Sequence, residues 1–388
     1  MLSSTSTRQD WLAEAARIAP LLRKEAPRTE ELRTISPPVV EAVRASGLLR
    51  LLQPASYGGA EADYDLLLQV LEILATGCPS TAWVGFNAAS HNWMLAMWPK
   101  SAQDAVWGPD PDAIVSSSLV YPAGKATLSD DESEYVISGT WPFSSGVGLA
   151  TYVMLGATVQ NGEAQGKRVI ALVPKNQINV IDVWHVAGLT GTGSNNLEAK
   201  ELRVRRDWVV DADSLSNASA PGLSINKAPI FRAPVFGLFP HLVATVILGN
   251  ARGAYDEFIA GAAQRKTTYA RLAPGQLVPL QLRVAEVGAL LTSAKLLLQE
   301  DAKEAMAIAR TGQAAPIEDQ IKWRRNAAFA ATQGTKAMDL LFAAYGGGGI
   351  YKANHAQQRF RDAHAAISHI QVSWDINAAE YGRQALGA

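Results

Sequence analysis

Apolar residues in the first hundred positions recur at spacings of three and four, which is the period of helices that bury one face. This pattern predicts helices over residues 13–22, 39–49 and 66–74. Residues 81–98 (TAWVGFNAASHNWMLAMW) are apolar nearly all round and predict a helix that is buried on most of its faces. The single histidine of this segment, His91, is conspicuous in such surroundings.

Between about residues 112 and 210 the pattern changes to short β-rich runs that are separated by Gly, Asn and Asp turns. The predicted strands cover residues 114–119, 135–139, 152–157, 169–173 and 197–204. We expect these strands to form a small antiparallel, barrel-like β domain.

Beyond Phe236 the helical period returns in long segments. The predicted helices cover residues 240–268, 276–310, 316–344 and a last region over 357–385. Their length and apolar stripes predict an up-and-down four-helix bundle. The order helical, β, helical indicates the α+β class, with a helical domain over 1–110, a β domain over 111–212 and a bundle over 213–388.

Charge and cysteine content exclude several kinds of partner. The 388 residues hold 35 Lys and Arg against 36 Asp and Glu, so no broad field favours nucleic acid or anionic lipid. The single cysteine, Cys78, excludes an intramolecular disulfide and a cysteine-based metal cluster. We find neither an export signal nor an uncharged apolar run of about 18 residues, and expect a cytoplasmic protein that binds a small ligand.

Two stretches of the β region combine hydroxyls, aromatic rings and glycines. Residues 140–146 (TWPFSSG) could pack rings on a planar cofactor and offer hydroxyls to its heteroatoms, or form a turn with core aromatics. Residues 184–196 (WHVAGLTGTGSNN) could bring backbone N–H groups close to a polar cofactor, or form a flexible turn. Neither stretch matches the dinucleotide or phosphate-loop motifs.

Histidines near both ends of the chain are candidates for acid–base chemistry. His91 could orient or deprotonate a phenol or an N–H group, because imidazole titrates near neutral pH. His364 and His369 lie five residues apart, which is about 140° around a helix and a poor geometry for one metal ion. We therefore predict no metal site. For each histidine the alternative is a hydrogen-bonded core residue.

In combination, the motifs resemble the acyl-CoA dehydrogenase superfamily over nearly the whole chain. The motifs that carry this resemblance are GLTGTGS (188–194), AAYGGGGIY (343–351) and RFRDAH (359–364). Those similar to its flavin-dependent oxygenases are CPSTAWV (78–84), HNW (91–93), GTWPFSSG (139–146) and SHIQVSWD (368–375). Such oxygenases act on para-hydroxyphenylacetate, secosteroid phenols, indole or dibenzothiophene.

The resemblance implies the oxygenase component of a two-component flavin monooxygenase. Such an enzyme takes reduced FMN, with FAD as the alternative, from a separate NAD(P)H-dependent flavin reductase. With O2 it forms a C4a-hydroperoxyflavin and hydroxylates a small aromatic substrate of the phenol or indole type. The resemblance also implies a homotetramer.

The same resemblance assigns the site residues. The catalytic residues would be His91, His369 and Ser145, whose hydroxyl would lie near flavin N5. The flavin-binding positions would be Trp141, Phe143, Ser144 (the fallback for Ser145), Trp184, Thr192, Ser194, Arg265, Gly347 and Gly348. The substrate-binding positions would be the two histidines together with Ser117 and Ser118.

One departure separates this chain from the dehydrogenases. A dehydrogenase needs a carboxylate base, commonly in a Tyr-Glu-Gly pattern after the RFRD segment, but here residues 367–370 contain His369. Glu286 stays open as a base supplied from elsewhere in the chain. The alternatives are therefore an acyl-CoA dehydrogenase and a flavin-free scaffold that keeps the fold for partner binding.

Overall fold

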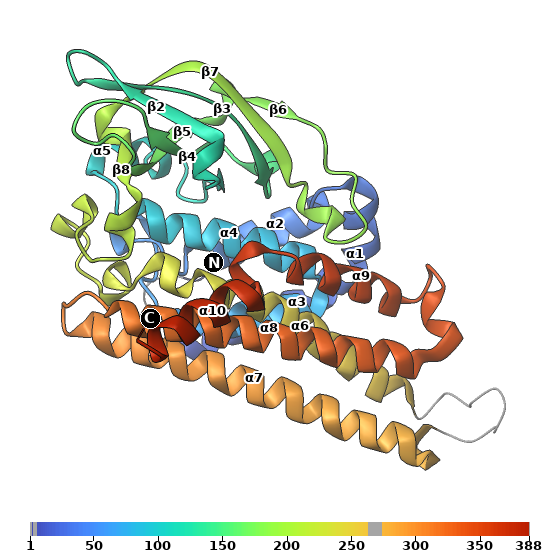
Figure 1. The fold of residues 1–388 in the computed structure, drawn as a ribbon. Coiled ribbons are helices and arrows are strands. Elements are labelled where there is room, and N and C mark those ends of the chain that lie inside the picture. Colours follow the sequence, from blue (N-terminus) through green and yellow to red (C-terminus); the bar gives the residue numbers. More distant parts are fainter. Residues whose placement is uncertain (1, 3–5, 263–273, 388) are drawn as a thin grey trace.

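The computed structural model describes residues 2, 6–262 and 274–387. Along the chain, one set of helices precedes a β-sheet and a second set follows it. In space, the sheet lies on one side of the helices (Figure 1). The first set comprises α1 (Arg8–Leu32), α2 (Pro37–Ser46), α3 (Tyr64–Gly77), α4 (Pro79–Leu95) and α5 (Lys100–Trp107). The second comprises α6 (Val235–Ala262), α7 (Val278–Arg310), α8 (Ile317–Tyr345), α9 (His355–Ile367) and α10 (Trp374–Ala385). This order confirms the predicted α+β class.

The helix α4 lies directly beneath the sheet (Figure 1). It begins with Pro79, because proline suits the first turn of a helix, where its missing N–H is not needed. All of its residues are buried except Gly85 and Asn87, which are partly exposed. The predicted helix with most faces buried is therefore confirmed, although it ends at Leu95 because the chain turns there toward Pro99.

The strands form one sheet in the order β6-β7-β3-β2-β4-β5-β8, with β1 beside β4. They are β1 (Val115–Ser118), β2 (Gly124–Leu128), β3 (Glu134–Ser144), β4 (Tyr152–Val159), β5 (Arg168–Pro174), β6 (Asn179–Ile181), β7 (Asn195–Arg205) and β8 (Val209–Asp211). The prediction of a purely antiparallel sheet is wrong, since β4 pairs in parallel with both β1 and β2. Alternating apolar residues do not reveal strand direction, which depends on the path of the connections.

The sheet has a hydrophobic core of its own, separate from the main helical core. Its largest fully buried side chain is Trp141, whose indole N–H donates to the Gly156 carbonyl at 2.6 Å. Gly124 and Gly139 leave room for this ring, because a Cβ at these positions would come within 2.6 and 2.9 Å of its atoms. Trp141 is thus a core residue of the sheet.

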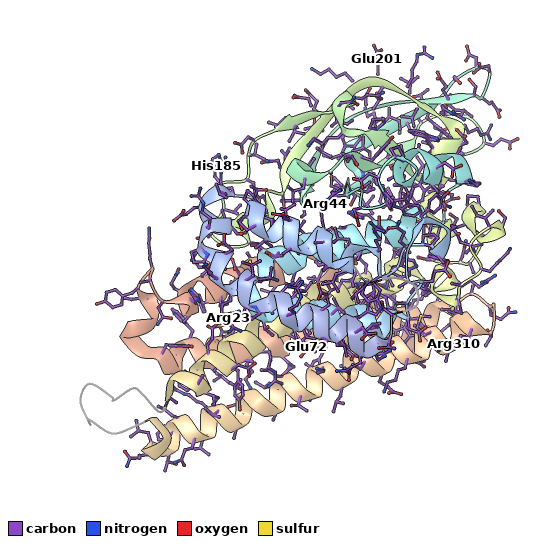
Figure 2. The ribbon with its side chains drawn as sticks, turned by 180° about the vertical axis from the view of Figure 1, so that it is seen from behind. Arg23, Arg44, Glu72, His185, Glu201 and Arg310 are labelled. Atoms are coloured by element: carbon purple, nitrogen blue, oxygen red, sulfur yellow. The ribbon has the colours of Figure 1, made fainter. Side chains whose placement is uncertain are left out.

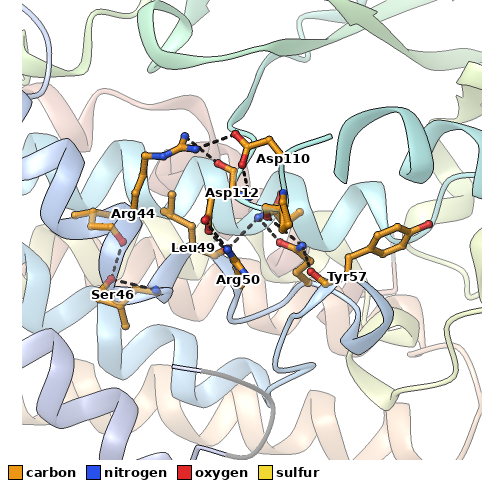
Figure 3. Close-up of polar contacts among 12 residues, drawn as sticks. Arg44, Ser46, Leu49, Arg50, Tyr57, Asp110 and Asp112 are labelled. Atoms are coloured by element: carbon orange, nitrogen blue, oxygen red, sulfur yellow. Dashed lines mark hydrogen bonds and ion pairs between the residues drawn. The ribbon is translucent and has the colours of Figure 1, made fainter. Parts of the chain in front are cut away.

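Two ion pairs fix the chain where it passes from the first helices into the sheet (Figure 3). Arg50 binds both carboxylate oxygens of Asp112, and Arg44 binds Asp110 at 2.8 Å. The Arg50 and Asp112 side chains are only 15% and 12% exposed, so solvent screens this pair less than a surface pair. The strand β1 begins shortly after Asp112 and is thereby held beside α4.

The helices α6, α7 and α8 run up and down beside one another, as predicted (Figure 1). Figure 2 shows Arg310 at the end of α7, across the molecule from Glu201 at the outer edge of the sheet. α6 begins at Val235 rather than at residue 240, and its predicted end at residue 268 lies outside the described residues. α6 is long and apolar enough to cross a membrane. However, 83% of the apolar 18-residue stretch that meets this condition is buried inside the protein, which is typical of a core helix.

The predicted last helical region is two helices, α9 and α10. The chain leaves α9 at Ile367 and makes a short 3-10 turn over Ile370–Val372 before α10 begins. His369 lies in this break and has an extended backbone conformation, so the turn and not a helix determines the orientation of its side chain.

Candidate active site

One side of α4 faces the sheet and the break between α9 and α10. Trp83 and His91 lie on this side, eight residues apart, which is about 12 Å along a helix axis. His91 contacts strand β1, whereas Trp83 contacts the residue that follows β3. The two side chains therefore mark the two ends of a candidate site.

His91 is 1% exposed, and both of its ring nitrogens are bonded. Nδ1 lies 2.6 Å from the Val115 carbonyl oxygen, which can only accept, so this nitrogen carries the proton. Nε2 lies 2.8 Å from the Ser117 hydroxyl and accepts from it in the neutral ring. Burial lowers the pKa of His91 to about 4, which keeps the ring neutral at pH 7. The side chain therefore offers a lone pair on Nε2.

Strand β1 turns its neighbouring serines to opposite sides. Ser117 is directed to α4 and binds His91, whereas the hydroxyl of Ser118 donates to the Pro142 carbonyl of β3. Because side chains alternate along a strand, only one of the two can face the imidazole. Of the two candidates for substrate contact, Ser117 is the one brought to the site.

The two serines at the end of β3 also separate. Ser144 is fully buried, and its hydroxyl lies 3.0 Å from that of Ser116. Ser145 is 9% exposed; its hydroxyl accepts from the Trp83 indole N–H at 3.1 Å and lies 2.8 Å from the Ser194 hydroxyl. A register shift between β3 and β7 just before Ser144 directs this turn toward α4. Ser145 is therefore the serine that reaches the site.

Phe143 and Trp184 form an aromatic pair near Ser145, with ring centroids 6.2 Å apart and edge to face. Phe143 is 64% exposed and has a φ of +64°, a strained conformation for a bulky residue. An exposed ring held in this way can pack on a planar ligand. Trp141, in contrast, is enclosed in the sheet core, so its predicted place in a flavin wall is corrected to a structural one.

A hydroxyl row, formed by Ser145, Ser194 and Thr192, leads from the site into the loop before β7. Ser194 lies 2.7 Å from Thr192, which donates to the Leu189 carbonyl at 2.8 Å. Thr192 and Ser194 are 2% and 3% exposed, so water does not compete for these bonds. Residues 188–194 of the glycine-rich stretch are therefore buried except for the partly exposed Thr190, whereas residues 185–187 are exposed.

The helix α9 holds this loop in place. Asp362 accepts from the Leu189 backbone N–H at 2.6 Å, and burial raises the pKa of this carboxyl to about 7. A Cβ on Gly188 would come within 2.2 Å of the Arg361 carbonyl oxygen, so only glycine allows this close approach. Arg361 in turn pairs with Glu30 of α1 at 2.8 Å. Within this chain Arg361 and Asp362 of the RFRDAH motif therefore make structural contacts, which join α9 to the loop and to α1.

His369 lies near the C-terminus of the chain, and its side chain packs against Trp83 of α4. Its ring centroid lies 5.6 Å from that of Trp83 and 6.3 Å from that of Phe239. Nδ1 accepts from the Gln371 backbone N–H at 3.2 Å, so the neutral ring carries its proton on Nε2. Burial lowers the pKa of His369 to about 4. His369 therefore offers an N–H, whereas His91 offers a lone pair.

Other predicted residues lie elsewhere. Arg265 lies outside the described residues. Gly347 and Gly348 are exposed in the turn between α8 and α9, and a Cβ on either would meet no atom of residues 2, 6–262 and 274–387 within 4 Å, so their flavin contact stays a prediction. Glu286 forms an ion pair with Lys336 at 2.8 Å at the surface and is not the buried base that a dehydrogenase needs.

The side chains around Ser145 fit a flavin ring system. Ser145 can still accept a hydrogen bond from a ligand, because an sp³ hydroxyl oxygen has two lone pairs and Trp83 uses one. Phe143 and Trp184 supply aromatic surface beside it. The two histidines supply one acceptor and one donor, both uncharged at neutral pH. This set suits a planar ring with apolar faces and a polar edge.

The sequence pattern did not point to Trp83 and Phe239, which contact Ser145 and His369. A signal for Trp83 was present, because a residue eight positions before His91 lies on the same side of a helix. We find no comparable signal for Phe239, since α6 is apolar on almost every face.

Comparison with known proteins identifies the family of this chain. The family described as acyl-CoA dehydrogenase, N-terminal domain, matches residues 9–110, and acyl-CoA dehydrogenase, C-terminal domain, matches residues 241–374. The chain is 32% identical over 353 residues to HsaA, the oxygenase subunit of a flavin-dependent monooxygenase from Rhodococcus jostii, with 91% of this chain and 92% of HsaA covered.

Two further similarities extend over almost the whole chain. The oxygenase component of an FADH(2)-dependent resorcinol hydroxylase from a Rhizobium species is 31% identical, with 97% of this chain and 94% of that protein covered. The crystal structure of 3-HSA hydroxylase from a Rhodococcus species has a TM-score of 0.92 at 31% identity, with 97% of both chains covered. The protein therefore belongs to the family of flavin-dependent monooxygenase oxygenase components that have the acyl-CoA dehydrogenase fold.

Proposed function

We propose that this protein hydroxylates a phenol, with an indole-type aromatic as the alternative, and that His91, Ser145 and His369 carry the reaction. The observation that supports this best is the buried, neutral His91, whose unprotonated Nε2 already accepts a bond from a hydroxyl group. A phenol O–H can bind Nε2 in the same way as Ser117. The resorcinol named for one relative is a phenol.

In this proposal each side chain has a separate task. His91 accepts the proton of the substrate O–H, which raises the electron density of the aromatic ring. General-base help of this kind is worth about 10²–10⁴-fold in rate. His369 donates its Nε2–H to the substrate or to the oxygen atom that is transferred. Ser117 holds the substrate hydroxyl beside His91.

Ser145 and the rings around it serve the cofactor. Bound reduced flavin supplies the two electrons that let O2 deliver one oxygen atom to the substrate and the other to water. Ser145 accepts the hydrogen bond of flavin N5–H. Trp83, Phe239 and Phe143 exclude water from this edge, since water promotes the release of hydrogen peroxide in place of product.

The remaining partners are proposed from the family. We expect FMN, with FAD as the alternative, delivered by a separate NAD(P)H-dependent flavin reductase, and a cytoplasmic homotetramer that binds neither nucleic acid nor membrane. Arg265, Gly347 and Gly348 would reach the flavin phosphate of a neighbouring subunit, which agrees with the exposure of the two glycines. The boundaries at residues 110 and 212 remain our proposed division of the chain.

The decisive experiment is a product assay with reduced FMN, O2 and a panel of resorcinol, indole and a thiophene. We expect a hydroxylated phenol, detected by chromatography and mass spectrometry, in proportion to the O2 consumed. Conversion of all O2 to hydrogen peroxide with every substrate in the panel would contradict the proposed chemistry.

Two controls address the alternatives. Anaerobic mixing of the FMN-loaded protein with an acyl-CoA is expected to leave the absorbance of oxidised flavin unchanged, whereas a dehydrogenase would bleach it. A flavin-free scaffold would not bind reduced FMN at micromolar concentration. We expect binding, because the polar edge and apolar faces of the flavin both have partners in the site.

A further inference from the structure

The hydroxyl row has two ends of opposite chemical character. At one end, the Trp83 indole N–H points to Ser145 Oγ at 3.1 Å, and an indole nitrogen can only donate. At the other end, Thr192 Oγ1 lies 2.8 Å from the Leu189 carbonyl oxygen, which can only accept. The two bonds in between, of 2.8 and 2.7 Å, join Ser145 to Ser194 and Ser194 to Thr192.

The two ends determine which hydroxyl donates and which accepts in every hydrogen bond of the row. Thr192 gives its single hydroxyl proton to Leu189, so it must accept from Ser194. Ser194 has then used its proton and must accept from Ser145. Ser145 therefore gives its own proton to Ser194 while it accepts from Trp83. What Ser145 has left is one lone pair and no proton.

We propose that the hydroxyl row makes Ser145 an obligate acceptor, so that the site selects flavin by its oxidation state. This inference rests on the proposed place of Ser145 beside flavin N5. Reduced flavin carries a hydrogen on N5 and can donate it to Ser145, whereas oxidised flavin has a bare, accepting N5. Ser194 and Thr192 are thus positioning residues, which act on the cofactor through Ser145.

The surroundings keep the row from reversing. Ser194 and Thr192 are almost fully buried, so no bulk water offers alternative donors or acceptors. The Leu189 carbonyl also accepts from the Trp184 indole N–H at 3.1 Å, and the Leu189 backbone N–H is bound to the Asp362 carboxyl. Leu189 adopts a φ of +51°, a conformation that leucine rarely takes without such bonds. The acceptor that ends the row is thereby held in place.

The discrimination has a functional consequence. The oxygenase must capture reduced flavin that a separate reductase releases, and it must discharge oxidised flavin after each turnover. Against oxidised flavin, the Ser145 lone pair would face the N5 lone pair, and the N5 hydrogen bond would be lost. A single hydrogen bond of this kind corresponds to about a tenfold difference in affinity.

The test uses the full-length protein and measures two equilibrium dissociation constants, one for oxidised FMN and one for anaerobically reduced FMN. In Ser194→Ala the Ser145 proton loses its acceptor and can turn toward N5. In Thr192→Val the Ser194 proton loses its acceptor and can turn toward Ser145, which frees the proton of Ser145. Both variants are expected to lower the ratio of oxidised to reduced Kd by about tenfold, mainly through tighter binding of oxidised FMN.

The midpoint potential of bound FMN gives an independent readout. A tenfold loss of preference for the reduced form lowers the potential of a two-electron couple by about 30 mV. Ser194→Thr keeps a hydroxyl in the row and should restore the wild-type ratio. Thr190→Val is a matched control, because Thr190 lies in the same loop and its hydroxyl donates to Val186 outside the row.

The outcomes separate this inference from the proposed function. An unchanged ratio and potential in both Ser194→Ala and Thr192→Val, with normal binding of reduced FMN, would overturn the inference alone. Wild-type protein that binds neither form of FMN would overturn the proposed function as well. Should Ser194→Ala fail to fold, Thr192→Val, which keeps the volume of threonine, decides the question.

Discussion

His91 and His241 are both buried histidines, but their partners differ in kind. His91 lies between α4 and the sheet and is bonded to a carbonyl and a hydroxyl. His241 lies in α6 at the centre of the bundle, where its Nε2 is 3.0 Å from the carboxylate of Asp301. The other oxygen of Asp301 accepts from Asn326 at 2.8 Å, so this group joins α6, α7 and α8.

The difference shows that burial alone does not mark a reactive histidine. A carboxylate accepts only, so it holds the Nε2 proton of His241 and leaves nothing on that nitrogen for a substrate. The partners of His91 instead leave Nε2 as an acceptor, bound to a hydroxyl that a substrate can replace. We therefore expect changes at His91 to affect chemistry and changes in the bundle to affect stability.

The largest expected effect is that of His91→Ala on hydroxylation. Loss of the base should lower product formation about 10²–10⁴-fold, while the Kd for reduced FMN changes little. Single-turnover product analysis and flavin titration measure the two quantities. His364→Ala is the matched control, since His364 is exposed and bound to Asp339. Product formation by His91→Ala within twofold of the wild type would remove His91 from the mechanism.

The counterpart in the bundle is Asp301→Ala, which leaves His241 and Asn326 without their shared acceptor. We expect the free energy of unfolding to fall by about 2–6 kcal/mol, because two buried groups lose their hydrogen-bond acceptor and each such loss costs about 1–3 kcal/mol. Chemical denaturation measures this loss. Product formation per folded molecule should stay within twofold of the wild type. A loss of activity in fully folded Asp301→Ala protein would show that the bundle group acts on the site.

A smaller, pH-dependent effect is expected for Asp362, which is buried like Asp301 but bonded to a backbone N–H. Its pKa of about 7 lies above that of an unfolded aspartate, so the native state keeps a proton that the unfolded state loses. Stability must then fall as the pH rises from about 4 to 7, by about 1.4 kcal/mol per pH unit. Asp362→Asn keeps the acceptor oxygen and should lose this dependence.

Denaturation of wild type and Asp362→Asn at pH 5 and pH 8 tests this effect. The wild type should lose about 3 kcal/mol more stability than the variant between the two conditions. The slope of about 1.4 kcal/mol per pH unit applies over the roughly two pH units between pH 5 and the pKa of about 7. Equal losses in both proteins would mean that the carboxyl is not protonated in the folded state at pH 5.

The smallest expected effect is a displaced acid limb in the pH dependence of hydroxylation. A base works only when unprotonated, and burial lowers the pKa of His91 to about 4. Product formation should therefore persist from pH 8 down to about pH 5, provided that the protein remains folded. An ordinary histidine would lose its base function near pH 6.5. A limb near pH 6.5 in the wild type would contradict the neutral, buried state of His91.

Much of the fold was predictable because it depends on local patterns. The α+β class, the buried helix α4 and the long helices α7 and α8 follow from periodicity, and their bounds are within a few residues of those expected. The strand direction was not predictable, since parallel and antiparallel pairs share the same alternation. The break that contains His369 was missed because a short turn between two helices leaves the apolar period nearly unchanged.

The choice between adjacent candidates also needed the structure. Ser117 and Ser118 lie on opposite faces of β1, and only Ser117 faces His91. A register shift between β3 and β7 brings Ser145 rather than Ser144 to Trp83. Trp141 stands two residues from Phe143 in one motif, yet one ring is enclosed and the other exposed. A one-residue change of register reverses such assignments.

By itself, the sequence determined which chemical groups this protein has: the candidate histidines His91 and His369, a serine-rich strand end, a glycine-rich loop and no carboxylate within residues 367–370, where a dehydrogenase commonly has its Tyr-Glu-Gly base. Only the tertiary structure decided how those groups are polarised, with opposite tautomers on His91 and His369 and a one-way hydroxyl row behind Ser145. The physical reason is that the direction of a hydrogen bond depends on both partners, and here the partners come from segments far apart in the chain.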